Sequence, residues 1–62
     1  MCLSNAYTLH GSEETLECEY VSDVKVTDGN VVLTDVLGQQ TTIPGQLMNV
    51  DLINNKIMII PA

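Results

Sequence analysis

Short runs of alternating apolar and polar residues, separated by turn residues, recur along the whole sequence of 62 residues. The breaks between these runs fall at His10–Ser12, Asp28-Gly29, Gly38, Pro44-Gly45 and Asn54-Asn55. Breaks at such short intervals leave room for strands of about five to eight residues and little room for helices. The pattern therefore predicts an all-β protein.

We expect six or seven short antiparallel strands in a single domain, residues 1–62. A sheet this small should close into a barrel, because a flat sheet would leave its edges exposed. The predicted strands are residues 2–9, 15–21, the segment with Val24 and Val26, and residues 31–36, 40–43, 46–53 and 56–60.

Residues 15–21 fit two patterns. Leu16, Cys18 and Tyr20 would share one face of a strand, with two glutamates on the other face. Leu16, Tyr20 and Val24 are also four residues apart, which is a helical spacing. We favour the strand because a period of two also accounts for the intervening acidic residues.

The turn residues predict how the strands connect. Asp28-Gly29 between β-branched runs is typical of a hairpin, in which a type I′ turn needs positive φ at both central residues. Asn54-Asn55 predicts another tight hairpin, because asparagine tolerates the left-handed region. Pro44-Gly45 should end a strand or mark a bulge, since proline cannot donate a ladder hydrogen bond.

The core expected from this composition is thin. Apolar residues make up 45% of the chain, but Phe and Trp are absent. A chain of this length buries only about 60% of the surface that its unfolded form exposes. We therefore expect a homodimer. The strand Ile57–Ile60 is apolar on both faces, which fits either a dimer interface or a central place in the barrel.

The charge disfavours two classes of partner. The net charge is −6, from eight acidic residues against Lys25 and Lys56. Nucleic acids and anionic membranes are bound by clustered basic residues, which this sequence lacks. No apolar run approaches the roughly 20 residues of a membrane span, and no signal-peptide pattern precedes the first strand. We expect a cytoplasmic protein with reduced cysteines.

The sequence predicts no enzyme. His10, the single histidine, stands beside a turn glycine, where a histidine is most often solvated. No other base of neutral pKa is available for acid–base or nucleophilic catalysis. Cys18 lies between two acidic residues, which oppose thiolate formation, and we expect it to pack in the core.

Met1-Cys2 is the candidate metal site. The α-amino group, the Cys2 amide nitrogen and the Cys2 thiolate could close chelate rings on one ion. Nitrogen and sulfur donors in one plane suit Ni(II) or Cu(II). The alternative is that Cys2 is a small apolar residue at the start of the first strand.

Three segments in order carry a resemblance to a known family. They are Met1-Cys2 with Asn5-Ala6-Tyr7, then Thr34–Gln40, then Val50–Ile57. On these segments, and over nearly its whole length, the chain resembles the CooT family of small nickel-binding proteins. Some members of that family have been described as predicted RNA-binding proteins.

The resemblance implies a small SH3-like β-barrel, a homodimer and Ni(II) bound at the N-terminal cysteine. It places Cys2 at the metal, with the Met1 amino group as co-ligand, and implies carbon monoxide dehydrogenase as the client. Asn55 stands where other members often carry His, which argues against a ligand in the last hairpin. Cys18 matches no ligand position of the family.

Two hypotheses follow. The first is a cytoplasmic, non-enzymatic Ni(II)-binding dimer that acts as a nickel chaperone or store. The second is a small barrel that binds a protein or RNA partner and uses Cys2 only structurally. The RNA form fits poorly with a charge of −6 and with so few aromatic residues for base stacking.

Overall fold

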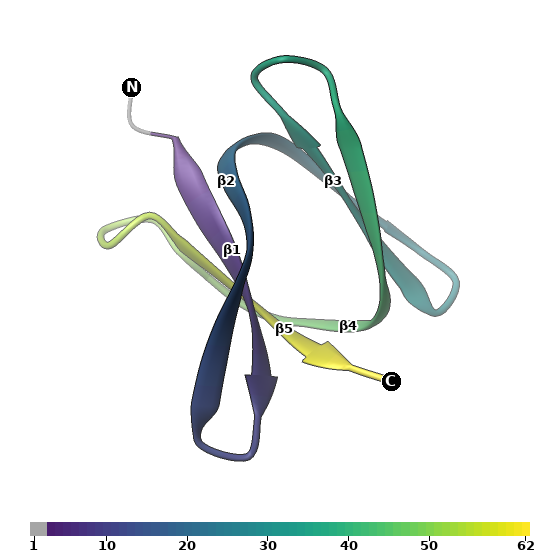
Figure 1. Ribbon diagram of the computed structural model, residues 1–62. Helices are drawn as coiled ribbons and strands as arrows, with labels where there is room; N and C mark the ends of the chain where they lie inside the picture. The colour runs from purple at the N-terminus through teal and green to yellow at the C-terminus, as the bar shows by residue number, and fades with distance from the viewer. Residues whose placement is uncertain (1–2) are drawn as a thin grey trace.

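Five strands form a closed barrel in the computed structural model, which describes residues 3–62 (Figure 1). Each strand is antiparallel to the next, and β5 closes the ring by pairing in parallel with β1, from Asn5–Lys56 to Thr8–Ile59. The strands are β1 Ser4–His10, β2 Glu13–Thr27, β3 Asn30–Asp35, β4 Gln40–Asp51 and β5 Lys56–Pro61.

The all-β barrel predicted from the sequence is confirmed, with five strands in place of six or seven and one parallel pair among the antiparallel ones. The lower number has two causes: one expected break, Pro44-Gly45, is a bend inside a strand, and two predicted strands run on without a break. The segments predicted at 15–21 and around Val24 are continuous in β2, and those at 40–43 and 46–53 are continuous in β4. Residues 3–62 contain no helix that is long and apolar enough to cross a membrane.

β2 bends at bulges and so continues as one strand around the barrel. The β1–β2 register shifts twice, once between the pairs Ser4–Val21 and Ala6–Cys18 and again before the next pair. An extra residue in one strand of a pair bends that strand and increases its twist. The shifts also break the expected alternation of faces, so Leu16 and Tyr20 are exposed.

The core consists of small aliphatic side chains from every strand. Leu33, Ile59 and Val31 are the largest that are fully buried, and truncating Leu33 or Ile59 to Ala should cost about 2–5 kcal/mol. Other buried apolar residues are Ala6, Val21, Ile43, Ile57 and Met58.

The apolar strand that could have been a dimer interface is mostly buried within the single chain. Ile57, Met58 and Ile59 are 3%, 7% and 0% exposed, and only Ile60 remains accessible, at 41%. Of the two interpretations of Ile57–Ile60, a central place in the barrel is therefore the one that the structure supports.

Gly45 lies at the bend of β4, where the strand passes close to the end of β5. Its φ is 149°, and a Cβ there would clash with the Ile60 carbonyl oxygen and lie 2.8 Å from the Pro61 Cα. The Gly45 amide donates to the Gly29 carbonyl at 2.9 Å. The predicted break at Pro44-Gly45 is thus a bend that only glycine can occupy without displacing β5.

The two predicted hairpin turns are present. Thr27 pairs with Asn30 across Asp28-Gly29, but among the non-glycine residues of 3–62 only Tyr20 and Asn55 have positive φ. The turn therefore has positive φ at Gly29 alone and is not the expected type I′. Asn55, with φ 55°, has the left-handed conformation predicted for the last hairpin.

Candidate functional site

Met1 and Cys2, the predicted metal ligands, lie outside the described residues. The structure shows the end of the barrel to which they are attached, beginning with Leu3 and the first residue of β1, Ser4. In Figure 1 the start of β1 lies between the β3–β4 turn and the β4–β5 turn. Groups that could support a site at the N-terminus therefore lie at this end of the barrel.

Asn5, in β1, is hydrogen-bonded to both the β2 bulge and the last hairpin at this end of the barrel. Its backbone amide donates to the Asn55 carbonyl at 2.9 Å. Its side-chain oxygen accepts a hydrogen bond from the Tyr20 amide at 3.2 Å, and the Tyr20 carbonyl accepts one from the Val36 amide at 3.1 Å. The start of β1 is therefore fixed against the β2 bulge and the last hairpin.

Tyr20 is held in an unfavourable backbone conformation by these contacts. Its φ is 55° and its side chain is 58% exposed. Positive φ is uncommon for residues other than glycine, asparagine and aspartate. Such conformations cost about 1–3 kcal/mol and gather at functional sites. The bulge thus holds an exposed tyrosine next to the start of β1.

Both turns beside the β1 start are capped by an aspartate at the end of the preceding strand. One Asp35 carboxylate oxygen accepts from the amides of Leu37 at 2.8 Å and Gln39 at 3.0 Å. Asp51 likewise accepts from the amides of Ile53 and Asn54, both at 3.0 Å. The two turns are therefore ordered by their own carboxylates.

The Asp51 carboxylate is stabilised in its charged form. The Asn54 side-chain amide donates to it at 2.8 Å. This bond, followed by the bond from the Asn54 backbone amide, lowers the pKa of Asp51 below its ordinary value. Hydrogen bonds donated to a carboxylate favour the ionised form.

Capping by aspartate leaves apolar side chains at the turn tips. Leu37 is 82% exposed and Ile53 is 90% exposed. We use the name apolar rim for the exposed apolar residues of these two turns, of the β2 bulge and of the residue before β1. Its members are Leu3, Tyr20, Val36, Leu37, Leu52 and Ile53.

Comparison with known proteins identifies the family. The family model for the CO dehydrogenase accessory protein CooT matches residues 1–60. The chain belongs to the CooT family.

A solved structure of similar fold carries the same family designation. It is the crystal structure of a candidate CooT from Carboxydothermus hydrogenoformans, which superposes with a TM-score of 0.89 at 23% sequence identity over 98% of each chain. At this identity the match shows a shared fold. A comparison with curated proteins finds no matching sequence.

The segments that carry the CooT resemblance meet at one end of the barrel. Asn5 contacts the β2 bulge and the last hairpin. Thr34–Gln40 includes the turn capped by Asp35, and Val50–Ile57 includes the turn capped by Asp51. These segments are recognisable in the sequence by their family resemblance, but the sequence did not predict that two of them form aspartate-capped turns. The signal for these turns is an aspartate followed by two apolar residues, which is present in both turns.

The second cysteine of this CooT family member behaves as predicted. Cys18 is half-buried and packs against the core cluster. Burial is the main cause that raises the pKa of its thiol, and Asp35 is the next. Glu19, one of the two acidic neighbours, also raises this pKa, and the Glu17 carboxylate accepts a hydrogen bond from the Thr8 hydroxyl at 2.8 Å.

His10 lies at the opposite end of β1, about 20 Å from Ser4 at the usual rise of a strand. Its ring contacts the Thr8 hydroxyl at 3.4 Å. Within residues 3–62 no group of three His, Cys, Asp or Glu side chains is placed to hold a metal ion. The structure thus gives His10 no partners for a metal site.

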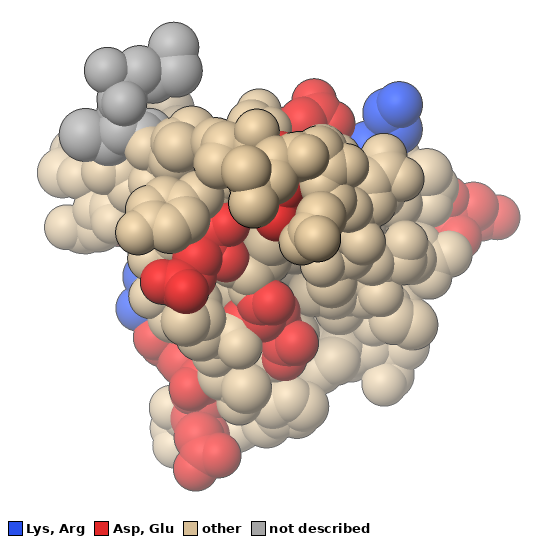
Figure 2. Space-filling view, turned by 45° about the horizontal axis from the view of Figure 1, so that its top comes forward, with Lys and Arg blue, Asp and Glu red and all other residues tan. Residues whose placement is uncertain are grey.

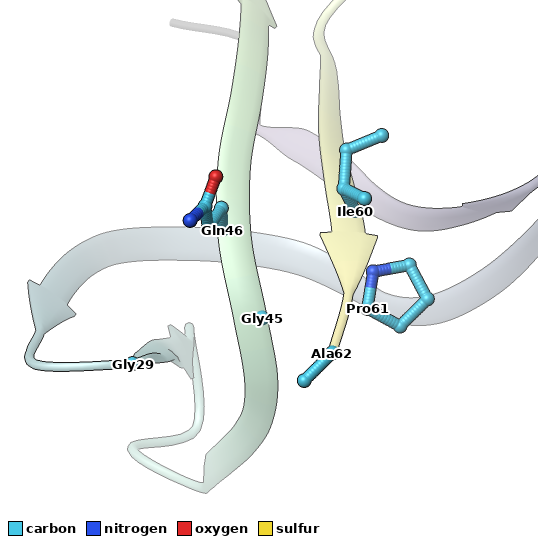
Figure 3. Close-up of a pocket in the computed structure, with 6 residues that line it drawn as sticks. All are labelled: Gly29, Gly45, Gln46, Ile60, Pro61 and Ala62. Carbon is cyan, nitrogen blue, oxygen red and sulfur yellow. The ribbon is translucent and has the colours of Figure 1, made fainter.

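Two shallow hollows lie near the C-terminal residues, away from the apolar rim. The first, of about 260 Å³, is lined by Gly29, Gly45 and Gln46 with the last residues of the chain, and contains no titratable side chain (Figure 3). The second, of about 370 Å³, contains His10 and Glu17 among threonines. In the second hollow the Thr8 hydroxyl contacts the His10 ring at 3.4 Å and donates to the Glu17 carboxylate at 2.8 Å.

Proposed function

We propose that this CooT family member binds Ni(II) through Met1 and Cys2 and acts as a chaperone or store for the maturation of CO dehydrogenase. The observation that carries the proposal is the family match, which covers residues 1–60 and so includes both proposed ligands. The protein has no catalytic role of its own in this proposal and works in the cytoplasm.

The donor chemistry supports nickel as the cargo. An amine, an amide nitrogen and a thiolate on adjacent residues suit the square-planar preference of Ni(II). A net charge of −6 raises the local concentration of cations. Asn5 supports the site indirectly, because its hydrogen bonds fix the strand that follows the ligands.

A Ni(II) titration of the parent protein and two cysteine variants tests the proposal. The parent should develop a thiolate-to-metal charge-transfer band. Cys2→Ser should lose the band and high-affinity binding while keeping the β-sheet spectrum of the fold. Cys18→Ser is the matched control and should bind nearly as the parent does, because Cys18 has no adjacent amine and its thiol is held protonated.

The proposed ligands predict that Ni(II) affinity depends on pH and on a free N-terminal amine. The thiol must release its proton on binding, so affinity should rise with pH. An extension before Met1 would convert the amine into an amide and should mimic Cys2→Ser in part. If Cys2→Ser binds Ni(II) as tightly as the parent, the chelate is wrong and Cys2 has a structural role only.

A homodimer is also part of the proposal. Its support is the small core and the number of large apolar side chains that the single chain leaves exposed, including Leu37, Leu52 and Ile53. A chain with 4171 Å² of accessible surface would bury about a fifth of it in an interface of standard size.

A further inference from the structure

The first half of β2 has a free edge. β2 has 15 residues, whereas its neighbours β1 and β3 have 7 and 6. Glu13–Cys18 pairs with β1, and β2 meets β3 only from Val21 onward. Among residues 3–62, therefore, no strand pairs with the other side of Glu13–Cys18. Such an edge carries unpaired backbone groups that can pair with another chain.

The register shows which backbone groups of this edge are unpaired. His10 and Glu13 face each other across the two-residue turn of the β1–β2 hairpin, and residues that flank such a turn exchange hydrogen bonds. Hydrogen-bonded and non-hydrogen-bonded pairs then alternate along the hairpin. Glu14 and Leu16 therefore direct their N–H and C=O groups away from β1, where an added strand could pair with them.

The second hollow lies beside this edge. Its lining comes from β1, β2, β4 and the end of β5, and includes Thr8, Glu17 and Thr41. The first half of β4 also has one unpaired side, because residues 40–44 pair with β3 and β4 meets β5 only from Gly45 onward. The hollow thus lies between two strand segments that are each paired on one side. An extended chain fits it, because such a chain can pair along an edge while alternate side chains enter the hollow.

The free edge is acidic. Glu13, Glu14 and Glu17 are all exposed on this segment, and Lys56 is paired with Glu14. Within residues 3–62, Glu13 and Glu17 have no basic partner. The Thr8 hydroxyl, on a residue 3% exposed, donates to the Glu17 carboxylate at 2.8 Å and so fixes it at the wall of the hollow. The β1–β2 turn projects at the bottom of Figure 1, and Figure 2 shows acidic side chains along the projecting lower end of the molecule.

Charge selects the occupant of this edge. A second copy of the chain would bring the same glutamates opposite one another, and like charges directly opposite destabilise a strand pair. Glu13 and Glu17 share one face of β2, because alternate residues of a strand point to the same side. Alternate residues of an added strand would reach both carboxylates. Leu16, 47% exposed on the other face, offers apolar contact to the residues in between.

We propose that the free edge at Glu13–Cys18 binds an extended segment of a partner protein as an added strand, with Lys or Arg at alternate positions directed at Glu13 and Glu17. Main-chain hydrogen bonds to Glu14 and Leu16 supply affinity, and the basic side chains supply specificity. The proposal does not rest on nickel binding. The edge lies at the other end of β1 from the turns whose exposed residues support the homodimer, so the two interactions use different surfaces.

An NMR titration of the full chain with three capped peptides of about seven residues tests the proposal. The first peptide alternates lysine with valine, the second alternates glutamate with valine, and the third is the lysine peptide with every backbone amide N-methylated. Only the first should bind. It should shift the amide signals of Glu14 and Leu16 and slow their exchange with solvent, because these amides gain hydrogen-bond partners. Added salt should weaken the binding.

Two double variants locate the binding. Glu13→Gln/Glu17→Gln should weaken binding of the lysine peptide about tenfold, and the Thr8 hydroxyl can still donate to the amide oxygen introduced at position 17. Asp23→Asn/Asp28→Asn is the matched control, because it removes the same amount of charge from exposed positions in the second half of β2 and the β2–β3 turn. It should bind the peptide as the parent does. Circular dichroism should show the same β-sheet spectrum for both variants.

Three results would overturn the proposal. Absence of binding by the lysine peptide at millimolar concentration would mean that the glutamates only protect the edge from pairing. Equal binding of the N-methylated peptide would mean that charge attracts the peptide without strand addition. Equal losses in the two double variants would assign the attraction to the net charge of the molecule. Cys2→Ser should bind the lysine peptide as the parent does, which keeps this test separate from that of the nickel site.

Discussion

At the scale of single residues, the surroundings of Cys18 keep its thiol protonated. Cys18 lies against the core, and its Sγ–H group faces the Glu19 carbonyl at 3.7 Å. Burial first, and Asp35 second, raise the pKa of this thiol. A thiol with a raised pKa contributes little thiolate at neutral pH, and the thiolate is the form that binds metals and reacts with electrophiles.

Cys18 should therefore react slowly with iodoacetamide. In the Cys2→Ser variant, which leaves Cys18 as the remaining thiol, we expect an alkylation rate at pH 8 several-fold below that of a cysteine in an unstructured peptide. The rate should rise to the peptide value when the protein is unfolded in urea. Equal rates in the folded and unfolded protein would show that burial does not protect the thiol.

Gly45 gives a second prediction at this scale. Gly45→Ala should destabilise the barrel by about 2 kcal/mol or more, because the new methyl group meets the β5 backbone and the φ of 149° is strained for alanine. Gly38→Ala is the control, since φ is 84° there but a Cβ would have nothing within 4 Å. Urea unfolding should show the larger loss for Gly45→Ala, and equal losses would mean that the close approach to β5 is unimportant.

At the scale of elements, the capped turns determine what the barrel presents to its surroundings. Asp35 and Asp51 each bond to backbone amides of the turn that follows. A carboxylate that satisfies these amides lets the tip residues remain apolar, because no tip side chain is needed to complete the turn.

The pKa shift of Asp51 predicts how the last hairpin responds to acid. Its pKa is lowered by folding, so its contribution to stability is complete above the unfolded-state pKa and is lost as the pH falls through the lower folded-state value. The NMR amide shifts of Ile53 and Asn54 should follow this titration, with a midpoint below that of aspartate in a model peptide. They should be insensitive to acid in Asp51→Ala. A midpoint at or above the peptide value would contradict the hydrogen-bonded turn.

At the scale of the whole molecule, a small core is combined with a large exposed apolar area. Among residues 3–62, eight apolar residues are buried, and several of the largest exposed ones lie on the apolar rim. A chain of this size gains stability from any partner that covers such a surface, and the gain depends on protein concentration when the partner is a second copy.

We expect a homodimer in sedimentation experiments at micromolar concentration, with a melting temperature that rises with protein concentration. A mass of 6.8 kDa throughout that range would refute it.

The sequence allowed prediction of those parts of the fold that depend on local patterns. The hairpins at Asp28-Gly29 and Asn54-Asn55 follow from turn residues, and the core role of Cys18 follows from its alternation with acidic residues. The bulge at Tyr20 was not predictable, because a register shift depends on the partner strand and has no signature of its own in β2. The same is true of Asn5, whose side chain contacts a residue that lies far along the chain.

The parallel pairing of β1 with β5 has a consequence for folding kinetics. Every other pair in the ring joins neighbouring strands, whereas this seam joins residues such as Ala6 and Ile57 from opposite ends of the sequence. Contacts of such high sequence separation form late, because a long loop must close first. We expect the four hairpins to form early and the seam to be the last part to close and the first to open. Amide protons of the seam should then exchange with solvent faster than those between β2 and β3, and the transiently freed β1 and β5 edges would be where two copies could exchange strands.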